Sequence, residues 1–355
     1  MTRPQAILLS LLLSAFGWTG VIGQNAADTI PLDSLGRISI FDAMGIHPDS
    51  FVQIQLKTDL PGLIRNRTKE LYQDASLALF STTGIRQDYR IEVKARGKTR
   101  KEICSLPPIK TKWKRKQLDS LGFSRHHEMK LVWQCKPGSH FEQILLREFM
   151  AYRLYNLISP YGYRVQLANL KVTDLNHPEK EQCKLGFFLE DDTQFEERTH
   201  GVLVKTPPSA SQQSIRRQEA LRLYVFQYMI GNTDWSLGNL HNVHMLQTSE
   251  DDKLVIVPYD FDYAGLVSAA YAVPHENIPI KDVRERYYKG LPCTPAEIDE
   301  LTAFYLEKKD LILTYCQQFP AINEPSRKDI ISYLEAFFAL LESKSGLHQV
   351  IPALK

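Results

Sequence analysis

Two stretches of alternating apolar and charged residues, a third predicted strand and a long amphipathic stretch constrain the fold of this chain most strongly. Residues 89–96 and 109–114 alternate with period two, which predicts two half-buried strands. Residues 128–135 predict a third strand. Residues 141–158 predict a helix, because apolar positions recur there every three or four residues. Two further strands, predicted near 163–172 and 184–189, complete the order β-β-β-α-β-β.

The second half of the chain is mainly helical in pattern. A stretch rich in Pro, Ser and Gln over 205–213 predicts a linker before it. The elements predicted after this linker are a helix over 215–229, two short strands near 243–246 and 253–258, a helix over 294–318 that starts with a capping box, and a helix over 326–343.

The composition is that of an ordinary globular protein, with 43% hydrophobic and 24% charged residues. These values exclude a disordered tail protein and a low-complexity chain. The formal net charge of +2 argues against a protein that coats nucleic acid, so we expect no nucleic-acid partner.

The first 23 residues have the pattern of a secretory signal peptide. Arg3 precedes an apolar run, and small residues then lead to an expected cleavage site between Gly23 and Gln24. We therefore expect an exported protein, periplasmic or extracellular. We expect no stable transmembrane segment in the mature protein, because no later stretch is long and apolar enough to span a membrane.

Export makes the five cysteines relevant. They show no metal-ligand spacing, and they allow at most two disulfides, whose pairing the sequence leaves open. Buried apolar thiols are the other interpretation. The five positions are Cys104, Cys135, Cys183, Cys293 and Cys316.

A strongly basic stretch lies over 86–116. Twelve Lys and Arg residues face only three acidic ones there. Clustered cations and loop amides favour phosphate groups, so one interpretation is an anion site that closes over a triphosphate or recruits an acidic acceptor. Within it, Arg96 and Lys112 are the residues that we expect to contact a nucleotide. The alternative is a solvated charged face.

The residues that carry chemistry lie between the helix over 215–229 and the strand ending at Pro258. Asp234 and nearby Asn residues follow the helix, and Asp260 and Asp262 follow the strand. Two adjacent short strands would bring these side chains to one edge. Hard oxygen ligands from separate loops suit Mg²⁺ held together with phosphates, and a further free Asp can orient a hydroxyl nucleophile. The alternative is that these are ordinary turn residues.

The motif Gly-Asn-Thr-Asp followed by an Asn and a strand, and then Tyr-Asp at the end of the next strand, resembles the atypical protein kinases. The branch it resembles is the CotH (spore-coat kinase) family, with HipA-type kinases as distant relatives. The resemblance implies that Asp234 is the catalytic residue and that Asp260 binds Mg²⁺ (or Mn²⁺), with Asp262 assisting. The metal-binding Asn is either Asn242, which we prefer because a strand follows it, or Asn239.

The same resemblance implies a cation on the third strand that contacts ATP phosphates and a Glu on the following helix that pairs with it. Lys130 and Glu148 fit these positions, and Lys136 with Glu142 is the alternative pair. The chain departs from the usual pattern in having no GxGxxG loop and in having Trp235 after the expected catalytic Asp.

These observations predict an α+β, two-lobed, protein-kinase-like fold, with a small β-rich lobe that carries one long helix and a mainly helical large lobe. The expected division is a signal peptide over 1–23, an N-terminal extension over 24–85, a nucleotide-binding lobe over 86–204 and a catalytic lobe over 205–355. The expected function is Mg²⁺-dependent phosphoryl transfer from a nucleoside triphosphate to a protein or small-molecule hydroxyl.

Other functions stay open at this stage. Because ATP is scarce outside the cytoplasm, a non-catalytic, pseudokinase-like envelope protein is the main alternative, and a protein nucleotidyltransferase that uses ATP in the opposite sense is the third. A zinc hydrolase using His241 and His244 is disfavoured, since residues three apart on a strand face opposite ways. A serine hydrolase at Ser236 and a glycosidase at Asp260 and Asp262 also lack supporting patterns.

Overall fold

The structure is a computed structural model that describes residues 32–33, 35–45, 49–80, 84–204 and 214–354. The described residues belong to one compact unit, Pro31–Lys355. The predicted signal peptide over 1–23 and the predicted linker over 205–213 lie outside the described residues. Among the helices in the described ranges, none is both long enough and apolar enough to span a membrane.

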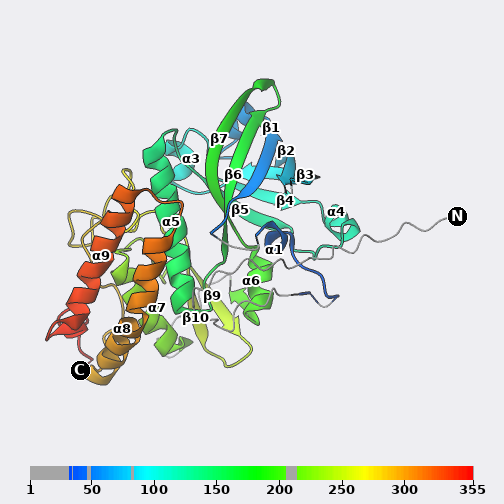
Figure 1. The fold of residues 1–355 in the computed structure, drawn as a ribbon. Helices are drawn as coiled ribbons and strands as arrows, with labels where there is room; N and C mark the ends of the chain where they lie inside the picture. Colours follow the sequence, from blue (N-terminus) through cyan, green and yellow to red (C-terminus); the bar gives the residue numbers. More distant parts are fainter. Residues whose placement is uncertain (1–31, 34, 46–48, 81–83, 205–213, 355) are drawn as a thin grey trace, which may run out of the picture. The chain divides into compact units, whose positions relative to one another are not determined.

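The main sheet is a closed barrel with the strand order β1-β2-β3-β4-β5-β7-β6 (Figure 1). Neighbouring strands pair antiparallel, except that β1 and β6 pair parallel, from Val52 opposite Ala168 to Thr58 opposite Asp174. The barrel strands are β1 Val52–Thr58, β2 Gln73–Phe80, β3 Arg86–Ala95, β4 Ile109–Trp113, β5 Glu128–Trp133, β6 Val165–Asp174 and β7 His177–Leu189.

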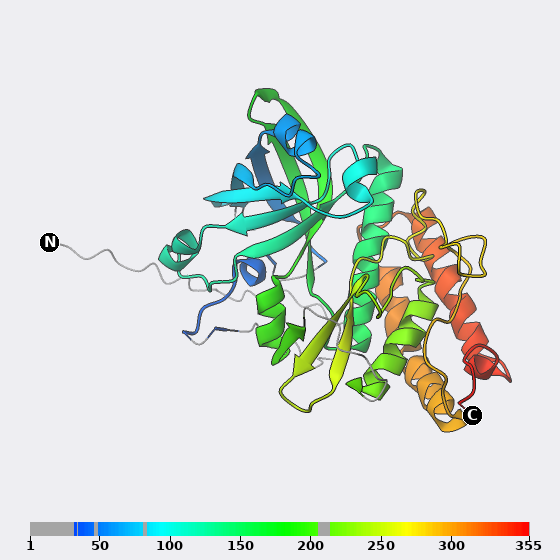
Figure 2. The same cartoon turned by 180° about the vertical axis from the view of Figure 1, so that it is seen from behind.

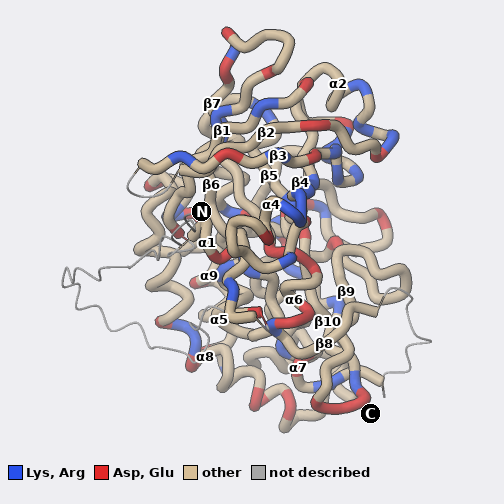
Figure 3. Tube along the Cα trace, turned by 90° about the vertical axis from the view of Figure 1, so that its right-hand side faces the viewer, with Lys and Arg blue, Asp and Glu red and all other residues tan. Residues whose placement is uncertain are grey.

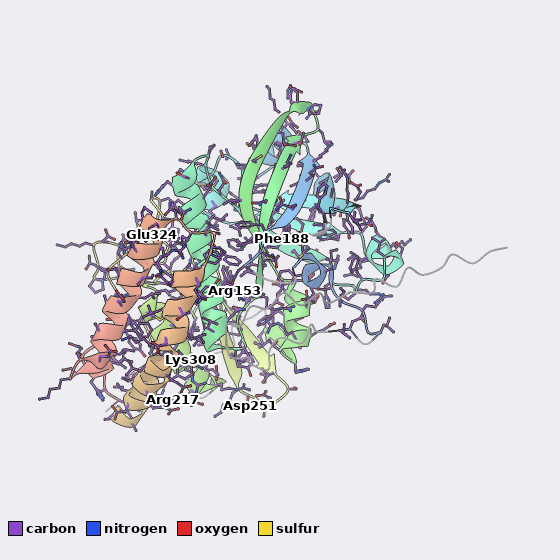
Figure 4. All side chains as sticks on the ribbon, viewed as in Figure 1. Arg153, Phe188, Arg217, Asp251, Lys308 and Glu324 are labelled. Atoms are coloured by element: carbon purple, nitrogen blue, oxygen red, sulfur yellow. A yellow bond between two sulfur atoms is a disulfide. The ribbon has the colours of Figure 1, made fainter. Side chains whose placement is uncertain are left out.

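The barrel interior is filled by the apolar face of each strand. Residues on β1 alternate between buried and more exposed positions, with Ile54 and Leu56 inside. Ile91 on β3 is fully buried in the same core, as is Phe188 on β7, which Figure 4 labels. This period-two pattern is what a sheet with one buried face requires.

The closed barrel shows that the predicted two-lobed, protein-kinase-like fold with a small β-rich lobe is wrong. The predicted order β-β-β-α-β-β is present as β3, β4, β5, α5 (Ser139–Ile158), β6 and β7. The segment expected to be an N-terminal extension, however, supplies β1 and β2. Because β1 pairs with β2 on one side and with β6 on the other, it closes the sheet and leaves no open edge.

A smaller sheet and the long helices make up the rest of the unit (Figure 2). The smaller sheet has the order β10-β9-β8, with β8 Gly201–Val204, β9 Val243–Thr248 and β10 Leu254–Pro258. The other helices are α1 Ile40–Met44, α2 Leu60–Arg65, α3 Arg100–Ile103, α4 Arg115–Ser120, α6 Asp192–Arg198, α7 Arg217–Met229, α8 Pro295–Gln318, α9 Glu324–Glu342 and a short 3₁₀ helix, Gly346–Gln349.

Helix α5 connects the barrel to the helical part of the unit. Its residue Phe149 is fully buried, with its ring 5.9 Å from that of Phe187 on β7 and 5.8 Å from that of Phe319 after α8. Tyr152 on the same helix packs edge-on against Phe261, which follows β10. The α5 core therefore fixes the loop after β10 relative to the barrel, and that loop carries two of the candidate site residues.

Candidate functional site

A tight turn after α7 positions Asp234. Gly231 adopts a left-handed conformation with φ of 65°, and a Cβ there would lie 2.2 Å from the Tyr333 hydroxyl. Only glycine meets both requirements without strain. The amide oxygen of Asn232 then accepts a hydrogen bond from the Asp234 backbone N–H at 3.1 Å. Trp235 is buried and stacks on Tyr224, so the residue after Asp234 anchors the turn in the core.

Asp234 and Asn242 are in direct contact. Nδ2 of Asn242 donates to the backbone oxygen of Asp234 at 2.8 Å and to its Oδ2 at 3.0 Å. His241 Nε2 lies 3.0 Å from the other carboxylate oxygen. Asn242 has φ of 53°, a conformation that Asn tolerates better than most residues. Both carboxylate oxygens of Asp234 therefore have partners that fix its orientation.

The two candidate asparagines differ in their surroundings. Asn242 is buried, and its backbone oxygen accepts from the N–H of Tyr259 at 3.0 Å, which links it to the end of β10. Asn239 is exposed, and its side-chain oxygen accepts from the backbone of His241 at 3.3 Å. The structure thus places Asn242 between Asp234 and the segment that leads to Asp260.

Asp260 and Asp262 follow β10 and lie in different environments. Asp260 is partly exposed, has φ of 62°, and donates its backbone N–H to the Tyr152 hydroxyl at 2.8 Å. Asp262 is buried, and its Oδ2 accepts from the Tyr271 hydroxyl at 3.1 Å. Burial raises the pKa of Asp262 to about 6, against the opposing effect of Arg100.

Arg100 on α3 is the residue that sequence reasoning missed. It is buried, with Nη2 at 2.5 Å from Glu148 Oε2, Nε at 2.8 Å from Asp262 Oδ2, and Nη2 at 4.0 Å from Asp260 Oδ1. Its only signal in the sequence was membership of the basic stretch over 86–116. One guanidinium therefore faces three carboxylates, and these include both Asp residues that follow β10.

Glu148 lies on α5 and has unused capacity as an acceptor. Burial, together with the charges of Asp262 and Asp260 and against the opposing effect of Arg100, raises the pKa of Glu148 to about 8. Its second oxygen, Oε1, is buried and accepts no hydrogen bond from the described residues. An added positive charge at this place would favour the ionised form of Glu148.

Lys130 does not form the expected ion pair with Glu148. Its ammonium group instead lies 2.9 Å from Asp192 Oδ1. The Tyr163 hydroxyl donates a hydrogen bond to the same carboxylate oxygen at 3.0 Å. The rings of Tyr163 and Tyr259 lie 5.1 and 5.5 Å from the Lys130 nitrogen. Burial lowers the pKa of Lys130, while Asp192 opposes this effect.

The alternative pair gains no support as a phosphate-binding pair. The Lys136 ammonium group lies 6.0 Å from the centroid of the Phe141 ring, on the first turn of α5. Glu142 occupies that same first turn, where the positive end of the helix dipole stabilises a carboxylate.

Lys and Arg residues of the basic stretch alternate with acidic residues along the barrel strands (Figure 3), and some of them form ion pairs. Lys112 lies 4.0 Å from Glu92 and 5.1 Å from the centroid of the Tyr72 ring. The charge of Arg96 acts on both Lys130 and Tyr259.

A disulfide joins Cys104, which caps α3, to Cys135, two residues after the end of β5. The backbone N–H of Ser105 also donates to the Cys135 oxygen at 3.0 Å. Cys293 and Cys316 are buried free thiols. The cysteines therefore include both a disulfide and buried apolar thiols, the two interpretations that the sequence left open. The disulfide fixes the short segment that carries Arg100 to the barrel.

The donor set suits a hard cation that also binds a ligand. Among the residues that the structure describes, no three His, Cys, Asp or Glu side chains are grouped so that they alone could hold a metal ion. Asn242 and Asp260 offer oxygen atoms, and Mg²⁺ commonly takes one or two protein carboxylates together with substrate phosphates and water. His241 and His244 have different partners, Asp234 and the Tyr163 hydroxyl, which gives no support to a zinc site.

Comparisons with known proteins do not place the chain in a family. No protein-family model matches the sequence. A search of the curated proteins gave no match. A solved structure, the Helicobacter pylori proinflammatory kinase CtkA, aligns with 12% sequence identity and a TM-score of 0.37, covering 64% of this chain and 88% of that one. A similarity of this size carries no argument about the fold or function of this chain, and the site is therefore argued from its own geometry.

Proposed function

We propose that this protein transfers a phosphoryl group from a nucleoside triphosphate, bound with Mg²⁺, to a hydroxyl group of a protein or small molecule. The observation that carries the proposal is the contact between Asp234 and Asn242 beside the segment that leads to Asp260. The Gly-Asn-Thr-Asp and Tyr-Asp motifs, which resemble those of the CotH kinases, are the sequence support for it.

We infer a separate role for each of these residues. Asp234 is held by His241 and Asn242, so its carboxylate is oriented to accept a hydrogen bond from the acceptor hydroxyl. Because Nδ2 of Asn242 donates to Asp234, its Oδ1 is the atom left to bind a metal ion, together with a carboxylate oxygen of Asp260. Mg²⁺ in that position would offset the charge of the phosphate oxygens.

The proposed reaction is a single displacement. The acceptor oxygen forms a bond to the γ-phosphorus, and the bond from that phosphorus to the bridging oxygen of the nucleoside diphosphate breaks. The hydroxyl proton passes to Asp234. Positioning and charge stabilisation supply the catalysis, so fixed orientation of Asp234 is the main contribution of the turn after α7.

Labelled ATP tests the proposal, with the protein itself and water as acceptors. We expect Mg²⁺-dependent transfer of label from the γ-phosphate, reduced about 10²- to 10⁴-fold in Asp234→Asn, since a positioned general base contributes about that much. Asn239→Ala is the matched control in the same loop and is expected to keep most of the activity. Transfer of label from the α-phosphate would show nucleotidyl transfer instead, and no transfer of either label would leave the non-catalytic alternative.

A further inference from the structure

The position of Arg100 relative to the candidate metal ligands has a consequence for nucleotide binding. Arg100 is the first residue of α3, and α3 lies beside α5 (Figures 1 and 2). Its hydrogen bonds to Glu148 and Asp262 use two of the five N–H donors of a guanidinium. The same group lies 4.0 Å from Asp260, the partly exposed carboxylate expected to bind the metal ion.

The structure assigns to Arg100, and not to Lys130, the role of binding the phosphates of the nucleoside triphosphate. Glu148 and Asp262 position the Arg100 guanidinium for this role. This inference rests on the proposed function, because it names the residue that binds the phosphates in the same site. Arginine suits the task, since its planar fork can hold two carboxylates on one side and offer further donors to phosphate oxygens on another.

The charge balance around Arg100 supports this assignment. One cation faces Glu148, Asp260 and Asp262, so the group carries excess negative charge when the carboxylates are ionised. The Oε1 atom of Glu148 is buried without a partner among the described residues. A metal ion at Asp260 would offset this excess, and the phosphates bound to that metal ion would lie within reach of Arg100.

The Lys130 ammonium group is already committed elsewhere. It forms an ion pair with Asp192, the first residue of α6, and lies beside the ring of Tyr259, which follows β10. These contacts tie β5 to α6 and to the residue that follows β10, and the Lys130 nitrogen lies beside the rings of Tyr163 and Tyr259. Lys130 therefore has the surroundings of a structural ion pair.

The segment that carries Arg100 is held in place independently of any ligand. The Cys104–Cys135 disulfide closes four residues after Arg100, and the backbone oxygen of Arg100 accepts from the N–H of Cys104 at 3.2 Å. A guanidinium held in this way loses little conformational freedom when a phosphate binds, which favours affinity.

Calorimetric titration of ATP in Mg²⁺ into wild type, Arg100→Gln and Lys130→Met tests the assignment. We expect the Kd for ATP to rise about 10- to 100-fold in Arg100→Gln, the range for loss of a charge-assisted hydrogen bond, and to change less than about threefold in Lys130→Met. Affinity for adenosine is the internal control, and it should change little in either variant.

The outcomes separate this inference from the proposed function. No ATP binding by the wild type would contradict both. ATP binding that is lost in Lys130→Met but kept in Arg100→Gln, or weakened equally in the two, would overturn the assignment alone. If Arg100→Gln does not fold, Arg100→Lys keeps the charge but not the fork, and an unchanged Kd in that folded variant would also overturn it.

Discussion

Nη2 of Arg100 lies 2.5 Å from Oε2 of Glu148, and this contact joins the short helix α3 to the long helix α5 across 48 positions of sequence. It replaces the ion pair expected between Lys130 and Glu148. The replacement matters because Arg100 also reaches Asp262, so a single cation connects the barrel, α5 and the loop after β10. The candidate site is organised around that connection.

Loss of the disulfide should destabilise the protein. Replacing Cys104 and Cys135 with Ser opens a loop with a sequence separation of 31, so we expect the free energy of unfolding to fall by about 2–4 kcal/mol. Denaturant unfolding measures this, with Cys183→Ser as a control at an exposed free thiol. The same midpoint for the double variant and the control would contradict the account.

Lys130→Met should lower stability rather than nucleotide affinity. The change removes the cation that pairs with Asp192 and lies beside the two tyrosine rings, so we expect a loss of about 1–3 kcal/mol. Lys171→Met is the matched control, since Lys171 pairs with Glu181 at an exposed position where ion pairs contribute about 0–1 kcal/mol. Equal denaturation midpoints for the two variants would show that Lys130 is not a structural residue.

The turn after α7 should not tolerate a side chain at Gly231. Gly231→Ala places a Cβ in a left-handed conformation and against the Tyr333 hydroxyl, so we expect a loss of more than about 1 kcal/mol. Gly238→Ala is the control in the same loop, because its nearest contact would lie at 3.9 Å. A thermal midpoint for Gly231→Ala equal to that of the control would contradict this role.

Acid should weaken the start of α8 through Glu297. Its carboxylate binds Arg217, labelled in Figure 4, with oxygen to nitrogen distances of 2.5 and 2.9 Å, and this pairing lowers the pKa of Glu297 from 4.5 to about 2. A lowered carboxyl pKa stabilises the fold above about pH 4.5, and the contribution is lost as the pH falls from 4.5 to 2.

We therefore expect Glu297→Gln to cost about 1–2 kcal/mol of unfolding free energy at pH 7, a modest value because solvent screens a partly exposed pair. The difference from wild type should be smaller at pH 2.5, because the contribution of the Glu297 carboxylate is lost as the pH falls. Unfolding measured across this pH range checks the result, with Glu300→Gln as a control on the same helix. A Glu297→Gln deficit that stays constant from pH 7 to pH 2.5 would refute the assignment.

The local elements of the fold could be predicted from the sequence, whereas the closure of the barrel could not. The alternation over β3 and β4 and the spacing on α5 identified those elements, because each signal lies within a few residues. The Val52–Thr58 stretch has the same alternation but lies in the segment expected to be an N-terminal extension. Its pairing with β6 joins residues more than a hundred positions apart, which no local pattern specifies.

The candidate site also has a part with a local sequence signal and a part without one. Asp234 and Asn242 lie eight positions apart, and Nδ2 of Asn242 donates to the Asp234 carboxylate. Arg100 was hidden among other basic residues, since its distinction is burial against Glu148 and Asp262 and not its spacing. Tertiary contacts, which the sequence pattern does not contain, decide which cation of a basic stretch enters the site.

Thermal melting with and without Mg²⁺ and ATP is the measurement that tests the central claim most directly. A ligand that binds only the native state at 100 times its Kd adds about 2.7 kcal/mol of stability, so we expect the wild-type midpoint to rise. Asp260→Asn keeps the left-handed backbone that Asn tolerates but removes the charge, and it should lose most of that rise. No rise at millimolar ATP, or an equal rise in Asp260→Asn, would contradict a metal–nucleotide site at Asp260.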